Sequence, residues 1–394
     1  MADEDELVRA ILAAPDDDAP RLVYADLLQQ RGDPRGELIA LQCNPPPAEA
    51  AARAAHARRE AELCRLHRAQ WLGAWFPHAR HHELVRGFLT ELSIGASHVA
   101  RAIRGLAADA HELVHLRALD LTWDDTDHLS DADLEAIVAH PALANLECLE
   151  ISAHGVRESS VALVARHLPN LAALVLDNQG IGDGAITALV AAPRPLARLR
   201  TLALRTQHLS PVVGAALATW PELAHIAELD FSSIDIHDSW CNALDDATVT
   251  ALAASPHNGA LTDLNLSDLP ITDASTHALA TCPRLTHLTS LGLGFTSISD
   301  ASALALPTAA FTRSLTTLDL SFTNLTDAGA ASLLQLPSLT SLDLSGTRIT
   351  TTTLHALLDT PHTFTRLTLR GLDVSLPTAL LEALTSRFPT ALEV

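Results

Sequence analysis

Apolar and polar positions follow one recurring pattern, Leu-x-x-Leu-x-Leu, over most of the chain. The pattern predicts a short strand, and the stretch after each copy predicts a helix, so every unit pairs one strand with one helix. A period of 24 to 35 residues is typical of a solenoid, in which units too small to bury their apolar faces alone stack on their neighbours. The copies begin at eleven positions: Leu89, Leu116, Leu146, Leu171, Leu199, Ile226, Leu261, Leu288, Leu315, Leu339 and Phe364.

The stretch from Leu315 to Pro337 shows the unit most clearly. Its three motif leucines should face the core, and the polar residues between them should alternate outward as far as Ser321, because successive side chains of a strand point to opposite sides. Thr326 and Asp327 offer side-chain oxygens that cap the helix that follows. The proline that closes the stretch helps to end this helix.

This repeated motif resembles the leucine-rich repeat proteins of the long-repeat, ribonuclease-inhibitor-like kind, from Leu89 to the end of the chain. The resemblance implies an α/β fold: a right-handed horseshoe of about 11 strand–helix units, with a concave parallel sheet and convex helices. Curvature follows because strands pack about 4.8 Å apart and helices about 8–10 Å apart. Partners of such proteins generally bind the side chains exposed on the concave sheet.

One position departs from the resemblance. The residue in the turn after the strand is usually Asn in these proteins, whereas Thr296, Thr323 and Thr347 occupy it in three repeats and Gln207 in another. A hydroxyl makes fewer hydrogen bonds than an amide does. We therefore expect a looser ladder of turns in the threonine repeats.

The first 88 residues follow a different pattern. It predicts three short helices, at residues 4–13, about 19–31 and about 35–42, and a longer helix from about 48 to 75. Residues 11–42, ILAAPDDDAPRLVYADLLQQRGDPRGELIALQ, resemble the small repeat-companion domain at the head of many myxobacterial and planctomycete proteins. That resemblance implies no particular chemistry.

Three domains are expected from these patterns. Residues 1–47 form the helical repeat-companion domain, residues 48–88 form a helical connector and N-terminal cap of the solenoid, and residues 89–394 form the leucine-rich repeat domain with a C-terminal capping helix. Caps are needed because the end units of a repeat array leave an apolar face open.

The composition indicates a folded protein with an aliphatic core. Hydrophobic residues make up 48% of the 394 residues and aromatic residues only 4%, which is ample for a sizeable core. The acidic start, MADEDELVRA, lacks the positive and apolar segments of a secretory signal, and no stretch has the roughly 18 apolar residues of a membrane span. Five scattered cysteines fit reduced thiols. We therefore expect a cytoplasmic protein.

The net charge of −21 lies mainly in the repeats. Residues 1–88 hold 11 Arg against 14 acids, a net charge of −3, and residues 89–394 carry the remaining −18. Nucleic acids and anionic membranes would be repelled, so neither is an expected partner. The chain has no lysine, which excludes Walker-type phosphate loops and Schiff-base catalysis.

Acids fall at outward positions of the expected concave sheet, where basic residues are few. Asp319 and Asp343 occupy matching positions of adjacent strands, as do Asp120 and Glu150, so the members of each pair should raise each other's pKa. One hypothesis is a docking surface for a basic partner; the alternative is a solvated face that keeps the protein soluble. The strand candidates for partner binding are Asp120, Glu150, Asp230, Asp263, Asp319 and Asp343. The basic residues at outward strand positions are Arg205, Arg366 and Arg370.

Two loops after strands are longer than the period requires and carry tryptophan among acids. Insertions in solenoids fall on one rim, and aromatic residues there resemble interface hot spots; the alternative is that each tryptophan covers its own loop. The acids of the first loop lack the Gly and distal Glu of a calcium site. The rim candidates for partner binding are Trp123, Asp124, Asp125, Asp235, Asp238 and Trp240, together with Phe295 and Phe322, which follow strands at matching positions.

The sequence carries no Gly-x-Ser-x-Gly elbow, complete Gly-rich phosphate loop or Cys-x-x-Cys pair. His78, His81 and His82 have a spacing that a helix can use for a metal, but their arginine-rich surroundings favour a solvated surface. We therefore expect no enzyme activity, no cofactor and no metal.

The function favoured by these features is that of a cytosolic adaptor or regulator, a monomer when free, that binds another protein with a basic surface. One alternative is a regulator of an enzyme, acting like a GTPase-activating protein or by plugging an active site. Another is a substrate or sensor component of a bacterial multi-protein pathway.

Overall fold

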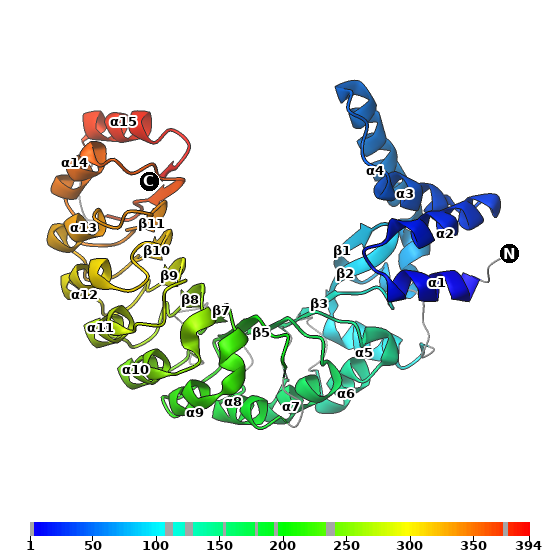
Figure 1. The fold of residues 1–394 in the computed structure, drawn as a ribbon, viewed down its shortest axis with the longest axis horizontal. Coiled ribbons are helices and arrows are strands. Elements are labelled where there is room, and N and C mark those ends of the chain that lie inside the picture. The colour runs from blue at the N-terminus through cyan, green and yellow to red at the C-terminus, as the bar shows by residue number, and fades with distance from the viewer. Residues whose placement is uncertain are drawn as a thin grey trace. The chain divides into compact units, whose positions relative to one another are not determined.

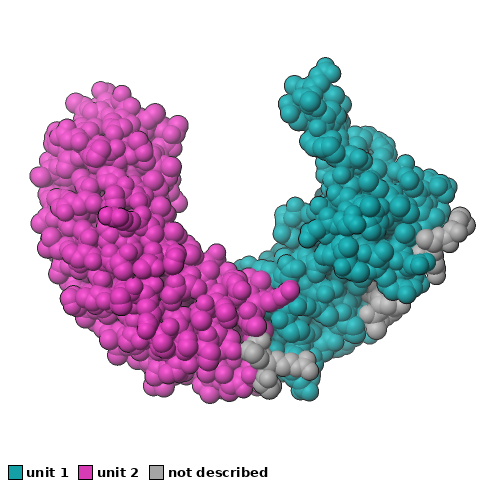
Figure 2. Space-filling view, in the orientation of Figure 1, with its two compact units in different colours: residues 1–156, 163–171 teal, residues 157–162, 172–394 magenta. Residues whose placement is uncertain are grey.

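The computed structural model describes residues 4–106, 113–122, 129–152, 155–177, 180–192, 196–233, 241–372 and 377–394. The chain forms two compact units, shown in teal and magenta in Figure 2. Unit 1 comprises residues 1–156 and 163–171, and unit 2 comprises residues 157–162 and 172–394. Each unit contains parallel strands that alternate with helices along the chain.

Unit 1 begins with helices and continues with strand–helix repeats (Figure 1). Its elements are α1 (Glu4–Ala13), α2 (Asp18–Gln30), α3 (Pro34–Cys43), α4 (Ala50–Leu72), η1 (Gly73–Trp75), β1 (Ala79–Val85), β2 (Phe88–Gly95), α5 (Ala96–Ile103), β3 (Ala118–Thr122), α6 (Asp131–Val138), η2 (Pro141–Leu143) and β4 (Cys148–Ile151), and α7 (Glu158–His167) has residues in both units. The first four helices lie where the sequence predicts them. Asp17 and Asp33 fix the starts of α2 and α3 by accepting backbone hydrogen bonds over 2.9 and 2.8 Å.

Residues 79–85 form a strand, although the sequence predicts a helical connector as far as residue 88. β1 pairs antiparallel with β2, and only two residues connect them. Arg86 and Gly87 both have positive φ angles, 52° and 77°, as a type I′ hairpin turn requires. His81 and His82 lie on β1 and His78 precedes it, so the three histidines do not share a helix; successive side chains of a strand point to opposite faces.

The long helix α4 extends away from the other elements of unit 1 (Figure 1). Its buried side chains are Leu63, Trp71 and Leu72, so it packs mainly through its C-terminal half. The sequence predicts that this helix closes the open end of the repeats. In the structure the sheet begins with β1, and the hairpin of β1 and β2 therefore occupies that end.

Helices α1 to α3 form the head of unit 1, and the head contacts the hairpin turn at Gly87. A Cβ atom on this residue would lie 2.2 Å from Ile39 Cγ1, so only glycine lets α3 approach the turn this closely. The Gly87 amide donates to Gln42 Oε1 over 2.7 Å, and its carbonyl accepts from Arg35 Nε over 2.7 Å. The head and the hairpin consequently share one core, whose buried residues are Leu7, Val8, Ile11, Tyr24, Ala25, Leu28, Ile39 and Phe88.

Unit 2 consists of strand–helix repeats that stack in sequence order. Its elements are β5 (Ala173–Asp177), α8 (Asp183–Val190), β6 (Thr201–Arg205), α9 (Val213–Thr219), η3 (Pro221–His225), β7 (Glu228–Asp230), α10 (Asp246–Ala254), η4 (Asn258–Ala260), β8 (Asp263–Asn265), α11 (Asp273–Thr281), β9 (Ser290–Gly292), α12 (Asp300–Ala305), η5 (Leu306–Thr308), β10 (Thr317–Asp319), α13 (Asp327–Leu333), β11 (Ser341–Asp343), α14 (Thr351–Asp359), β12 (Arg366–Thr368), α15 (Thr378–Arg387) and β13 (Leu392–Glu393). Neighbouring strands are parallel. Within this unit the strands line the inner side of the curve and the helices the outer side (Figure 1).

The motif leucines form a continuous core between the strands and helices of unit 2. Leu315, Leu318 and Leu320 are buried, as the pattern predicts. Ser321 is buried as well, with 6% of its surface exposed, although the pattern predicts that it faces outward. The strand of this repeat is only three residues long, so the alternation ends at Asp319 and the chain then turns inward.

Aspartates at the starts of α10 to α13 link their repeats to the next one. Thr326 caps α13 by accepting a hydrogen bond from a backbone amide of the helix, as predicted, but Asp327 bonds to the following repeat instead. Its carboxylate accepts from Thr350 N over 2.8 Å and from Thr350 Oγ1 over 2.6 Å. Equivalent bridges join Asp246 to Thr272, Asp273 to Ser299 and Asp300 to Thr326.

The turns after the strands use two kinds of side-chain hydrogen bond. In a threonine repeat the hydroxyl donates to a carbonyl of its own turn, as Thr323 Oγ1 does over 2.7 Å. In two earlier repeats an amide reaches the preceding repeat: Gln207 donates to a carbonyl there over 2.7 Å, and buried Asn242 does so over 2.8 Å. The threonine turns thus lack this bond between repeats, which agrees with the expected looser ladder.

Candidate partner-binding surface

The predicted partner-binding residues fall into three groups. Asp120 and Glu150 lie on the strands of unit 1. Asp230, Asp263, Phe295, Asp319, Phe322 and Asp343 lie in unit 2. Trp123, Asp124, Asp125, Asp235, Asp238 and Trp240 lie outside the described residues. The two tryptophan loops therefore stay predictions.

In unit 1, Asp120 and Glu150 are register partners on β3 and β4, as predicted. Ser93 Oγ donates to Asp120 Oδ2 over 2.7 Å. Together with Cys148 these side chains line a pocket of about 420 Å³. Burial, and then the charges of the neighbouring carboxylates, raise the pKa of the Cys148 thiol. The thiol therefore stays protonated at neutral pH and is a poor nucleophile.

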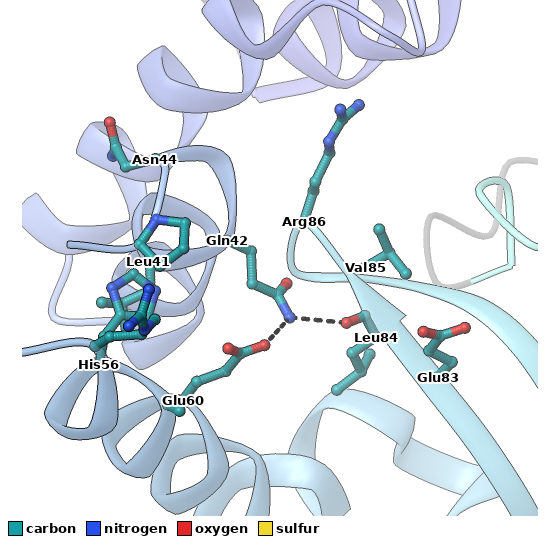
Figure 3. A pocket seen from close by; sticks show the side chains of 12 residues that line it. Leu41, Gln42, Asn44, His56, Glu60, Glu83, Leu84, Val85 and Arg86 are labelled. Carbon is teal, nitrogen blue, oxygen red and sulfur yellow. Dashed lines mark hydrogen bonds between the residues drawn. The ribbon is translucent and has the colours of Figure 1, made fainter. Parts of the chain in front are cut away.

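A second pocket of unit 1, of about 410 Å³, lies between α3, α4 and β1 (Figure 3). Gln42 joins the elements around it. Its Nε2 donates to Glu60 Oε1 over 2.7 Å and to Leu84 O over 2.9 Å, while its Oε1 accepts from the Gly87 amide over 2.7 Å. Both ends of the Gln42 amide thus hold α3 to its neighbours, to Glu60 of α4 and Leu84 of β1 at one end and to the hairpin turn at the other.

In unit 2, an arginine neutralises part of the acidic sheet face. Arg205 Nε lies 2.7 Å from Asp230 Oδ2, and Arg205 Nη1 lies 3.4 Å from Asp177 Oδ2. The strand register explains one contact, since Asp177 and Arg205 pair directly across β5 and β6. The candidate Asp230 is therefore part of an ion-pair cluster and not an isolated negative charge.

The strands β8 to β11 carry the acidic part of this face. Their outward positions, all of which the structure describes, hold Asp263, Asp319 and Asp343 and no basic side chain. Burial is the main cause that raises the pKa of Asp319, and the charge of Asp343 on the next strand adds to it; hydrogen bonds from Ser321 and the charge of Arg366 oppose the rise. The rise predicted for Asp319 is thus present, but burial contributes more to it than the neighbouring carboxylate does.

Phe295 and Phe322 stack at the carboxyl ends of two of these strands. Their ring centroids are 4.3 Å apart, with 16° between the ring planes. The two side chains nevertheless stay 44% and 49% exposed. Exposed aromatic groups beside polar ones are typical of surfaces that bind other molecules. We call the set formed by Asp263, Asp319, Asp343, Phe295 and Phe322 the acidic–aromatic surface.

Beyond β11 the strands of unit 2 carry charges of both signs. Arg366 and Arg370 both contact Glu393, at 3.2 and 2.9 Å. Ion-pair groups thus flank the acidic–aromatic surface at both ends, one around Arg205 and one around Glu393. Between these two groups, the outward positions of β8 to β11 hold Asp263, Asp319 and Asp343.

Two features of this surface could not be predicted from the sequence patterns. The Arg205 contacts depend on the register of three strands, and the stacking of the phenylalanines depends on a left-handed backbone at both rings. A usable signal for the carboxylates is the repeated Asp-Leu-Ser. In it Asp319 Oδ1 and Asp343 Oδ1 each accept from the amide of the serine two residues later, over 2.8 Å, which fixes the orientation of both side chains.

The described ranges contain no cluster of three or more His, Cys, Asp or Glu side chains that would hold a metal ion. Within the same part of the chain, every helix falls short of the length or apolar character that a membrane span needs.

Residues 313–356 match a family model described as leucine-rich repeats, two copies. They include β10, α13 and β11 and extend into α14. The α/β strand–helix fold predicted from the sequence is therefore confirmed.

Two solved structures resemble the chain over larger parts of its length. The crystal structure of the TLR13-ssRNA13 complex matches with 20% identity and a TM-score of 0.45; the match covers 74% of this chain, which spans only 37% of that one. The crystal structure of the Rad7 and Elc1 complex in yeast matches with 14% identity and a TM-score of 0.47, covering 88% of this chain and 94% of that one. No match was found among curated proteins.

Proposed function

We propose that this chain is a non-catalytic module that binds another protein, one with a basic surface, on the acidic–aromatic surface of unit 2. The observation that supports the proposal best is the distribution of charge on β8 to β11, where three aspartates face outward and the outward positions of these strands hold no basic side chain. The exposed phenylalanine pair adds apolar area beside them. Charge complementarity steers the partner, and the aromatic area stabilises the complex once formed.

The paired arginines support a partner with positive charge. Arg205, Arg366 and Arg370 form their ion pairs with other acids of their own unit; the charge of Arg366 also acts on Asp319, but less strongly than burial does. The raised pKa of Asp319 points the same way, because a carboxylate that is partly buried beside another one is stabilised by a nearby cation.

The wider role that we propose is that of a cytosolic adaptor or regulator, monomeric when free, with neither nucleic acids nor membranes as partners. The net charge of −21 supports this proposal, since polyanions and anionic lipids would be repelled. We further propose that residues 1–47 are a repeat-companion domain and that residues 48–88 connect it to the repeats.

Affinity capture from the native cell, with the full chain as bait, tests the proposal. The double variant Asp319→Arg/Asp343→Arg should lose the captured protein, and capture by the wild type should weaken as the salt concentration rises. The control variant Asp359→Arg/Glu382→Arg carries the same change in charge at exposed positions of α14 and α15. It should retain capture.

Circular dichroism and thermal melting of each variant separate a lost surface from a lost fold. A milder pair, Asp319→Asn/Asp343→Asn, removes the charges with little change in volume and should weaken capture to a smaller extent. Undiminished capture at low salt by a folded double-arginine variant would rule out this surface.

A further inference from the structure

A third pocket of unit 1, of about 370 Å³, lies between the head and the first repeats. Its lining comes from the loop between α1 and α2, from α2, from the hairpin of β1 and β2, and from the residues just before β3 and β4. The volume is in the range of small-molecule sites, about 300–1,000 Å³. The lining residues with a formal charge are Asp16, Arg21, Arg86, Arg117 and Glu147.

Arg21 is the buried charge of this pocket. Only 5% of its surface is exposed. Within the described part of the chain it makes one hydrogen bond, from Nη1 to the carbonyl of Asp17 over 2.9 Å, and its Nε is buried without an acceptor. A buried donor without an acceptor costs free energy, and the cost is larger when the group is charged. A negatively charged group in the pocket would offset this cost.

Two further arginines line the pocket with donors to spare. Arg86 places its Nε 3.1 Å from Asp18 Oδ1, and its Nη1 donates to a backbone carbonyl over 3.1 Å. Arg117 Nη1 donates to Asn145 O over 3.1 Å and lies 3.7 Å from Glu147 Oε1. None of these contacts uses Nη2 of either arginine, so both side chains keep donors for a ligand.

The acids of the pocket lie at exposed positions. Asp16 is exposed, and the Glu147 side chain is 52% exposed, so water weakens the effect of both charges. Burial first, and then the charge of Arg86, lower the pKa of Arg21. The positive charge of Arg86 therefore acts on Arg21 more strongly than the negative charge of either Asp16 or Asp18 does. The buried part of the pocket is consequently positive.

A carboxylate fits this pocket better than other anions do. The planar fork of a guanidinium matches the two oxygens of a carboxylate. A phosphate dianion would bring a second negative charge close to Asp16 and Glu147. The rings of Phe88 and His115 also line the pocket, with their centroids 4.0 Å apart, and they suit a ligand with an apolar part.

We propose that this pocket binds the carboxylate of a small organic acid, with Arg21 as the buried opposing charge and Arg86 and Arg117 as further donors. This inference goes beyond the proposed function. It concerns residues of unit 1 alone and does not depend on the acidic–aromatic surface of unit 2.

Ligand-observed NMR with the full-length protein tests the inference. The probe is benzoate, and benzamide is its control because it has the same shape without the charge. Benzoate should bind about 10-fold more tightly than benzamide, since a charge-assisted hydrogen bond is roughly twice as strong as a neutral one. Acetate should displace benzoate, and inorganic phosphate should do so less effectively.

Three variants locate the binding. Arg21→Met keeps an unbranched side chain without the charge and should lose the preference for benzoate over benzamide. Arg117→Gln should weaken benzoate by about 3-fold, as the loss of one of several donors. Arg58→Gln is the matched control, because it makes the same change of charge at an exposed position of α4 and should leave benzoate binding unchanged.

Thermal melting separates a ligand-binding arginine from a structural one. Benzoate should raise the melting temperature of the wild type and not that of folded Arg21→Met, because a ligand stabilises only a protein that binds it. A purely structural arginine would lower the melting temperature of the variant and leave the rise with benzoate intact. If Arg21→Met does not fold, Arg86→Gln and Arg117→Gln decide, since these side chains are 32% and 27% exposed and both variants should weaken benzoate.

Several outcomes would overturn the inference. They are a wild type that does not bind benzoate or binds benzamide equally well, unchanged benzoate binding by folded Arg21→Met or by both glutamine variants, and tighter binding of phosphate than of benzoate. Each of these outcomes leaves the proposed function standing, because that proposal is tested separately by capture with the arginine variants of Asp319 and Asp343.

Discussion

The head of unit 1 and the repeats of unit 2 hold their elements together in opposite ways. In unit 1 a single position, Gly87, combines a positive φ, close approach to Ile39 and hydrogen bonds through both its amide and its carbonyl. In unit 2 one kind of aspartate bridge recurs from repeat to repeat. Loss of the contacts at Gly87 should destabilise the head as a whole. Loss of one aspartate bridge should destabilise only the repeats beside it, because each repeat depends only on its neighbours.

The largest effect is expected for Gly87→Ala. The new methyl group forces a left-handed conformation on alanine and overlaps Ile39, so the loss of stability should be roughly 2–5 kcal/mol, the sum of backbone strain and overpacking. Denaturant unfolding of the full chain measures it. Gly32→Ala is the control, because Gly32 has a similar φ of 75° but nothing within 4 Å of the added Cβ. Equal losses in the two variants would contradict a role for the contact with Ile39.

A smaller and more local effect is expected for Asp273→Ala. Its carboxylate accepts from the amide and hydroxyl of Ser299, over 2.9 and 2.6 Å, and also bonds to Ser302. Removing it should cost about 1–3 kcal/mol, because partly buried donors lose their acceptor. Hydrogen exchange should increase in the repeats of α11 and α12 and not near α14. A uniform increase throughout unit 2 would contradict local failure.

The same aspartate bridges make stability depend on pH in a defined direction. Burial acts to raise the pKa of Asp273, but hydrogen bonds from Ser299 and Ser302 together hold it below its ordinary value. A lowered folded pKa contributes stability above the unfolded value of about 4, and this contribution is lost as the pH falls through the folded pKa. The cost of Asp273→Ala should therefore shrink in strongly acidic solution.

The contrast between the two units also shows what the sequence can predict. The repeats can be predicted from the sequence because each one buries the same apolar positions, and the spacing of the motif leucines already indicates the strands. The hairpin of unit 1 occurs once. Its turn, Arg86 and Gly87 between two apolar pairs, is a recognisable signal, but the need for glycine opposite Ile39 arises only after α3 has packed against it.

The acidic–aromatic surface is predictable to a similar degree. Matching positions in adjacent repeats place Asp319 beside Asp343 and Phe295 beside Phe322, and the register and the stacking confirm both pairs. The pairing of Asp230 with Arg205 could not be read from one strand, because a side chain of this length reaches acids on both neighbouring strands.

A smaller loss of stability than that of Asp273→Ala is expected for Thr323→Val. The substitution removes one buried hydrogen bond, from the hydroxyl to a carbonyl of the same turn, and should cost about 1 kcal/mol. Asn242→Ala provides the comparison, since the Asn242 side chain accepts from two amides and donates to two carbonyls. Its loss should be clearly larger in the same unfolding experiment. Equal losses would mean that the threonine turns are no looser than the amide turns.

The smallest effect, and one of opposite sign, is expected for Asp319→Asn. Burial first, and the charge of Asp343 in addition, raise the pKa of Asp319, so its charged form is less favourable in the folded state than in the unfolded one. Stability should fall as the pH rises from the unfolded value of about 4 through the raised folded pKa. Asparagine keeps an acceptor for the Ser321 amide without the charge. The variant should therefore equal or slightly exceed the wild type in stability at pH 7 and lose this advantage in acid, while it binds a basic partner less well. A variant less stable than the wild type at pH 7 would mean that the Asp319 carboxylate stabilises the fold and is not held there at a cost.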